Sequence, residues 1–175
     1  MALTKVRTAG IDSVDRSKLS QVLVYANSSS ANGGFAAGAW EGIPYETEVI
    51  DTNSAFVGSA STDTNNAGIF TCPVAGKYFI SVGQVFENTT SDYNLGAGYI
   101  RLTKHASDAT QGGTAIVGTK QGFLFPSASN DVASASTSCI LDLSVGNVIW
   151  AEAYANWHAG VWRADEGYYL VMQIG

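Results

Sequence analysis

The stretch Phe70-Thr-Cys-Pro-Val-Ala-Gly-Lys-Tyr-Phe79 decides the fold, because it joins a strand end, a tight turn and the start of a second strand. Pro73 and Gly76 favour turns, since proline fixes φ and glycine adopts backbone conformations that other residues avoid. If φ at Gly76 is positive, a β-branched residue there would be strained. Apolar residues then occupy every second position from Tyr78 to Val82, the period-two pattern of a strand with one buried face.

The same alternation recurs along the chain and predicts an all-β protein. Ser138–Trp150 has the pattern of two strands joined by a turn at Gly146, and Gly167–Ile174 that of a final strand. Val148–Ala151 is apolar on both faces, as expected where a strand is covered on both sides. Nineteen glycines and only 14% charged residues favour short strands and turns over long surface helices. We therefore predict a single domain that is an all-β sandwich.

The order of these segments resembles the jelly roll shared by the globular head of complement 1q and the tumour necrosis factor ligands. The resemblance covers residues 35–175, and the positions that carry it are Phe70, Pro73, Gly76, Tyr78, Phe79, Leu141, Leu143, Gly146, Val148, Trp150, Gly167, Tyr168 and Leu170. Asn147 stands where the family usually has an aspartate, and asparagine supports a tight turn about as well. The resemblance implies an antiparallel jelly-roll sandwich that works as a homotrimeric binding or assembly module and not as an enzyme.

The resemblance also implies an apolar flank that a monomer cannot cover. We expect Trp40, Tyr169 and Val171 to contribute to this trimer interface, on whichever face of the last strand points away from the core. An extensive apolar interface would make the trimer obligate.

The charge distribution divides the chain into an arm and a body. Residues 1–21 contain four basic and two acidic side chains, a net charge of +2, whereas the rest contains five basic and thirteen acidic side chains, a net charge of −8. We divide the chain into an N-terminal arm (1–21), a short strand with a Ser/Asn/Gly linker (22–34) and the jelly roll (35–175). The arm is either a disordered tail or an extended peptide that orders on a partner. The candidate docking residues of the second interpretation are Leu3, Lys5, Val6, Arg7, Ile11, Val14, Arg16, Lys18 and Leu19.

The first residues of the chain indicate a viral protein. Ala2-Leu-Thr-Lys-Val6, followed by Ile11-Asp12, is similar to N-terminal segments of bacteriophage fibre and appendage proteins. The opening has no apolar region of a secretory signal, and no run approaches the ~18 apolar residues of a membrane span. We interpret Cys72 and Cys139 as two thiols of a protein assembled in the cytosol, although a bridge remains open.

Catalytic, metal and nucleic-acid sites find little support. The two histidines, His105 and His158, belong to no H-E-x-x-H pattern, and there is no C-x-x-C, G-x-S-x-G or phosphate-binding loop. We expect no cofactor. Calcium ligation is conceivable but has no supporting spacing among the candidate oxygen donors, Asp63, Asp92, Asp131 and Asp165. A body of charge −8 repels phosphate, which disfavours nucleic acid as a partner.

The best candidate for a binding loop is Asn156–Arg163. Two tryptophans, a histidine and an arginine in eight residues would stack on sugar rings or grip a protein, because aromatic side chains with arginine dominate interface hot spots. The alternative is that these aromatic side chains pack between protomers. The candidate residues are Tyr93, Trp157, His158, Trp162 and Arg163.

Two functions follow from these patterns. The first is a structural virion protein: a trimeric decoration, cement or short head-fibre protein that is assembled in the host cytoplasm. It would attach to the major capsid protein, or another virion protein, at the capsid surface through its arm. The second is the receptor-binding tip of a phage tail fibre that recognises a host-surface glycan or protein.

Overall fold

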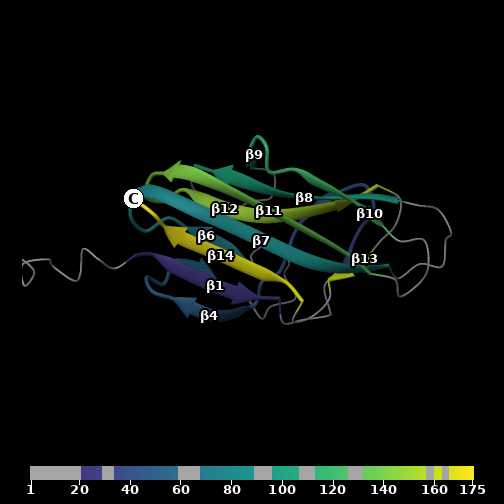
Figure 1. Cartoon of the computed structure of the whole chain (residues 1–175), viewed down its shortest axis with the longest axis horizontal. Coiled ribbons are helices and arrows are strands. Elements are labelled where there is room, and N and C mark those ends of the chain that lie inside the picture. Colours follow the sequence, from purple (N-terminus) through teal and green to yellow (C-terminus); the bar gives the residue numbers. More distant parts are fainter. Residues whose placement is uncertain are drawn as a thin grey trace, which may run out of the picture.

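The computed structural model describes residues 21–28, 34–58, 68–88, 96–106, 113–125, 132–156, 160–162 and 166–175. In these segments the chain forms fourteen strands and no helix, arranged as two sheets of seven strands (Figure 1). Every pairing between two named strands is antiparallel. The predicted all-β, antiparallel class is therefore confirmed.

The first sheet, sheet A, contains β1 (Leu23–Asn27), β2 (Gly34–Phe35), β4 (Thr47–Asp51), β7 (Gly76–Asn88), β11 (Val132–Leu143), β13 (Gly160–Trp162) and β14 (Tyr168–Gln173). The long strand β7 pairs with β11 on one side and with β14 and β13 on the other. Beyond β14 follow β1 and then β4. β1 is an interior strand of this sheet, so residues 23–27, which we placed before the jelly roll, belong to the sandwich.

The second sheet, sheet B, contains β3 (Trp40–Gly42), β5 (Phe56–Val57), β6 (Ile69–Thr71), β8 (Gly96–His105), β9 (Thr114–Ala115), β10 (Gln121–Phe125) and β12 (Val148–Ala155). Its central pair is β8 with β12. On the far side of β12 lie β3 and β6, and on the far side of β8 lie β9 and β10.

The core fills the space between the sheets. Every second residue from Tyr78 to Phe86 of β7 is buried, as the alternation predicted. The fully buried rings of Tyr45 and Tyr169 meet edge to face, with centroids 5.4 Å apart. Their hydroxyl groups donate to backbone carbonyls of β7 and β12, so the core contains polar atoms that are satisfied. Burial raises the pKa of both phenols, which keeps them neutral.

Strand β12 is covered on both faces, as predicted. Trp150 points away from the inter-sheet core, yet it is fully buried and forms a second apolar cluster with Ile69 and Val148. Its indole lies directly over Gly42 of β3, where an added Cβ would approach the ring to 2.3 Å. Gly42 is therefore the residue that allows a tryptophan to lie flat on this sheet.

The predicted turn at Gly146 is present between β11 and β12. Gly146 has φ of 82°, and the side chain of Asn147 accepts a hydrogen bond of 2.9 Å from the backbone N–H of Ser144. Asn147 thus supports the turn, as predicted. Gly76, in contrast, is not among the described glycines with positive φ, so the strain argument does not apply to it.

Gly76→Val should nevertheless lower the free energy of unfolding by more than about 1 kcal/mol, as overpacking does. A Cβ at Gly76 would lie 2.6 Å from the backbone oxygen of Gly175 and 2.8 Å from Nε2 of Gln173. Urea denaturation measures the change, and Lys77→Val at the exposed neighbouring position is the control. Equal unfolding midpoints for the two variants would contradict this packing.

Candidate assembly face

The outer face of sheet A, which points away from the core, carries a continuous apolar surface. The apolar side chains come from β1, β4, β7, β11 and β14, strands that lie next to one another in Figure 1. Strand alternation places them on the same face of the sheet. Ile140 is 62% exposed and Ile50 is 41% exposed, while the others are half-buried. We define the assembly face as Leu23, Tyr25, Ile50, Phe79, Ile140, Tyr168, Leu170 and Met172.

The strand register aligns these side chains in rows. Leu23 lies opposite Met172, Met172 opposite Phe79, and Phe79 opposite Ile140, so one apolar row crosses four strands. The neighbouring row consists of Ile50, Tyr25 and Leu170, followed by Ser81 and Ser138. Contiguous exposed apolar surface of this kind is typical of a protein–protein interface.

Beside the rows the face is hollowed. Gly83 lies beneath the ring of Tyr168, where an added Cβ would approach the ring to 2.5 Å, and the Tyr168 hydroxyl lies 3.2 Å from Oγ of Ser81. The hollow has a volume of about 250 Å³, and half of the residues that line it are small: Gly83, Ser134, Ala135 and Ser136. Apolar rows beside a hollow form a shaped surface suited to receiving side chains of a partner.

No protein-family model matches the sequence, and no curated protein matches it. Among solved structures, the globular domain of zebrafish complement 1qA protein matches with a TM-score of 0.56 and 13% identity, over 89% of this chain and 98% of that chain. Eiger TNF from S. frugiperda matches with a TM-score of 0.59 and 9% identity, over 89% of this chain and 93% of that chain. Murine APRIL matches with a TM-score of 0.57 and 8% identity, over 88% of this chain and 99% of that chain. The chain has the jelly-roll fold of these domains. At such low identities the likeness establishes the fold, which was predicted, and nothing further.

The jelly roll corrects the expected interface residues. Tyr169 and Val171 are fully buried between the sheets, because β14 turns these two positions towards sheet B. The face that β14 points outwards carries Leu170 and Met172 instead. Trp40 belongs to the other sheet, since β3 pairs with β12, and so it does not lie on the assembly face.

Most other candidate residues lie outside the described part of the jelly roll. Trp162 falls in β13, of which only the backbone is described. The ring of His105 lies 6.5 Å from that of Trp150.

Within the described residues no group of three or more His, Cys, Asp or Glu side chains could hold a metal ion. No helix among the same residues is long and apolar enough to cross a membrane. Outside the description lie Leu3, Lys5, Val6, Arg7, Ile11, Val14, Arg16, Lys18, Leu19, Asp63, Asp92, Tyr93, Asp131, Trp157, His158, Arg163 and Asp165.

The two cysteines are free thiols, in agreement with our interpretation of the sequence. Cys72 is buried, and Cys139 is half-buried on β11. Burial raises the pKa of the Cys139 thiol to about 11, so this thiol stays protonated and unreactive near neutral pH.

Proposed function

We propose that this jelly roll assembles into a homotrimer through the assembly face and serves as a structural protein of a virion. The exposed apolar rows of sheet A carry the proposal. Apolar burial contributes about 25 cal/mol per Å², so covering rows that span four strands would offset much of the entropy lost on association. The resemblance to trimeric complement and tumour necrosis factor domains supports the same stoichiometry.

A trimer is a ring, in which each copy offers one surface to the next copy and a different surface to the previous one. The second surface would be the edge formed by β10 and β11. β10 is an edge strand of sheet B and β11 is an edge strand of sheet A, and the two strands are in contact. Leu124 is 71% exposed and Val132 is 49% exposed at this edge. The assembly face of one protomer would thus cover the β10–β11 edge of the next.

We assign the trimer to the capsid surface of a bacteriophage, with the major capsid protein as its partner. Residues 1–21 support this, because they combine a net charge of +2, scattered apolar anchors and a similarity to phage appendage proteins. Three arms on one trimer would reach several capsid subunits, and each tethered arm would bind at a high effective concentration. The protein would be assembled in the host cytoplasm and need no cofactor.

The receptor-binding tip of a tail fibre is the second candidate. A cluster of aromatic and basic side chains on the outer face of sheet B, described below, favours it.

Removal of residues 2–20 should leave a soluble trimer that no longer attaches to capsids. Gln21 is retained because its carbonyl accepts a hydrogen bond from Thr52, and Val22 because it is buried in the core. Counting bound copies after mixing the truncated protein with undecorated capsids measures attachment. Charge reversal at Lys5, Arg7, Arg16 and Lys18 should weaken attachment in the full chain, and added salt should do so more modestly. Full occupancy without the arm would show that a surface of the jelly roll makes the contact.

A further inference from the structure

A row of aromatic rings crosses the outer face of sheet B, on the opposite side of the sandwich from the assembly face. Trp40 of β3 lies opposite Tyr154 of β12, and Tyr154 lies opposite Tyr99 of β8. The ring centroids are 5.3 Å apart for Trp40 and Tyr154, and 6.2 Å apart for Tyr99 and Tyr154. All three side chains are partly exposed, so they offer a surface about three strands wide. We call these rings, together with Arg101, Lys120 and Glu152, the cation–aromatic cluster.

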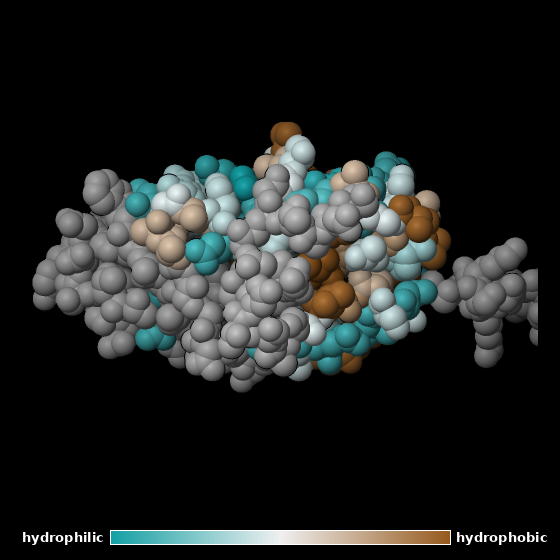
Figure 2. Space-filling view, turned by 180° about the vertical axis from the view of Figure 1, so that it is seen from behind, coloured by the Kyte–Doolittle hydropathy of each residue, from teal (hydrophilic) through white to brown (hydrophobic). Residues whose placement is uncertain are grey.

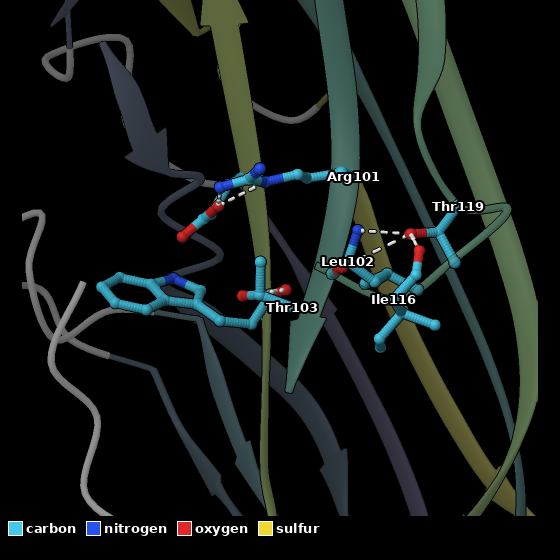
Figure 3. Close-up of polar contacts among 7 residues, drawn as sticks. Arg101, Leu102, Thr103, Ile116 and Thr119 are labelled. Atoms are coloured by element: carbon cyan, nitrogen blue, oxygen red, sulfur yellow. Dashed lines mark hydrogen bonds and ion pairs between the residues drawn. The ribbon is translucent and has the colours of Figure 1, made fainter. Parts of the chain in front are cut away.

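Arg101 and Glu152 form a rigid centre for the cluster. Nε and Nη2 of Arg101 both lie 2.7 Å from Oε2 of Glu152 (Figure 3), and the guanidinium lies 3.8 Å from the centre of the Trp40 ring. Glu152 is only 2% exposed, so a positive partner is needed to hold its charge in place. Both contacts use the same carboxylate oxygen of Glu152.

Lys120 adds a second positive charge to the cluster. Its ammonium lies 4.0 Å from the centre of the Tyr99 ring and 5.8 Å from that of Trp40. Among the described residues Lys120 forms no ion pair, so it gives the cluster a net charge of +1. Only five basic residues follow residue 21 in a chain of net charge −6, and two of them lie here. A positive site on an acidic protein selects an anionic ligand.

The backbone beside Lys120 is held firmly by its neighbour. Thr119 is fully buried, and its hydroxyl accepts a hydrogen bond of 3.1 Å from the N–H of Leu102 and lies 2.8 Å from the carbonyl of Ile116 (Figure 3). The turn from Ile116 to Thr119, between β9 and β10, projects from the surface with a hydrophobic tip (Figure 2), where Val117 is 98% exposed. The backbone of Lys120 is thus held in place, so that a ligand needs to order only the side chain.

We propose that the cation–aromatic cluster binds a saccharide that carries a carboxylate, such as a uronic or sialic acid. The apolar C–H face of a sugar ring packs against an aromatic ring, whose face is electron-rich. Lys120 would bind the carboxylate, while the guanidinium of Arg101, whose side chain is 18% exposed, would bind hydroxyl groups. A row of rings suits the repeating rings of an oligosaccharide. One net positive charge is too little for a nucleic acid, whose binding depends on several phosphate contacts.

This inference does not rest on the proposed virion role. The cation–aromatic cluster lies on the opposite side of the sandwich from the assembly face, and in a trimer three clusters would act together on a surface rich in acidic glycan. The site is therefore tested on the intact protein, whatever its assembly.

The experiment titrates the full-length protein with trigalacturonate, sialyllactose and a chondroitin tetrasaccharide, and follows binding by calorimetry and NMR. We expect saturable binding of at least one acidic probe below about 10 mM, and at least about tenfold weaker binding of its methyl ester. Lys120→Gln should weaken binding about tenfold, and Tyr99→Leu should weaken acid and ester alike. Lys77→Gln, which removes an exposed lysine of sheet A, is the matched control and should leave affinity unchanged.

Several results would contradict the proposed saccharide site. Failure of all three acidic probes to bind, or equal affinity for an acid and its methyl ester, would each do so. If Lys77→Gln and Lys120→Gln lost the same affinity, the loss would be due to the overall charge of the protein and not to this site. If an acidic peptide competed for the site as strongly as the sugar does, the ligand would be a protein partner and not a saccharide. Thermal unfolding of each variant separates loss of binding from loss of the fold.

Discussion

Replacement of Trp150 by alanine should lower the free energy of unfolding by about 3–5 kcal/mol, the usual cost of removing a large buried aromatic side chain. The indole is fully buried against Ile69 and Val148, and it rests on Gly42. Alanine would leave a cavity that the flat strand beneath cannot fill. Chemical denaturation followed by circular dichroism measures the change.

Two comparisons show whether the cavity is the cause. Trp150→Phe should cost much less than alanine, because the ring is retained and because the indole N–H finds no hydrogen-bond partner among the described residues. Val117→Ala, at a position that is 98% exposed, should leave stability almost unchanged. If Trp150→Ala unfolds at the same denaturant concentration as Val117→Ala, the second apolar cluster does not stabilise the fold.

Leu170→Glu should convert the proposed trimer into a folded monomer. Leu170 lies in the middle of the assembly face, opposite Tyr25 on one side and Ser81 on the other. In the trimer each glutamate would be buried without a partner, which costs several kcal/mol per interface, whereas in the monomer it would reach water. Sedimentation velocity at micromolar concentration measures the mass, and circular dichroism confirms that the monomer is folded.

Val57→Glu is the matched control for this experiment, because Val57 is 51% exposed on β5 of sheet B. It adds the same charge away from the assembly face and should remain trimeric. A wild-type protein that sediments as a monomer would refute the proposed assembly. A trimeric Leu170→Glu variant would move the interface to another surface.

The sequence predicts the strands of the jelly roll better than it predicts their faces. In the final strand both Tyr169 with Val171 and Leu170 with Met172 are apolar, so the period-two pattern cannot say which pair points inwards. The choice depends on the sheet opposite, which places the first pair in the core. The expected interface was therefore assigned to the wrong pair.

The cation–aromatic cluster escaped prediction for a different reason. Trp40, Tyr99 and Tyr154 are far apart in the sequence, and only the pairing of β3, β12 and β8 brings them together. One local signal was present: Glu152 interrupts an apolar strand that is covered on both faces, and a buried carboxylate requires a partner. That signal indicates an ion pair but does not identify Arg101 as its other half.

The pairing of β1 with β14 gives the sandwich a base and a tip. Leu23 lies opposite Met172, and the N–H of Gln173 donates to the carbonyl of Val22, so the beginning of β1 and the end of the chain share one end of the molecule. In Figure 1 the C-terminus marks that end, whereas β10 and β13 lie towards the other. If the arm attaches a trimer to a capsid, as we propose, a reporter fused after Gly175 would stand between the particle and the trimer and obstruct attachment. A peptide for display on the particle surface belongs at the far end, close to β10.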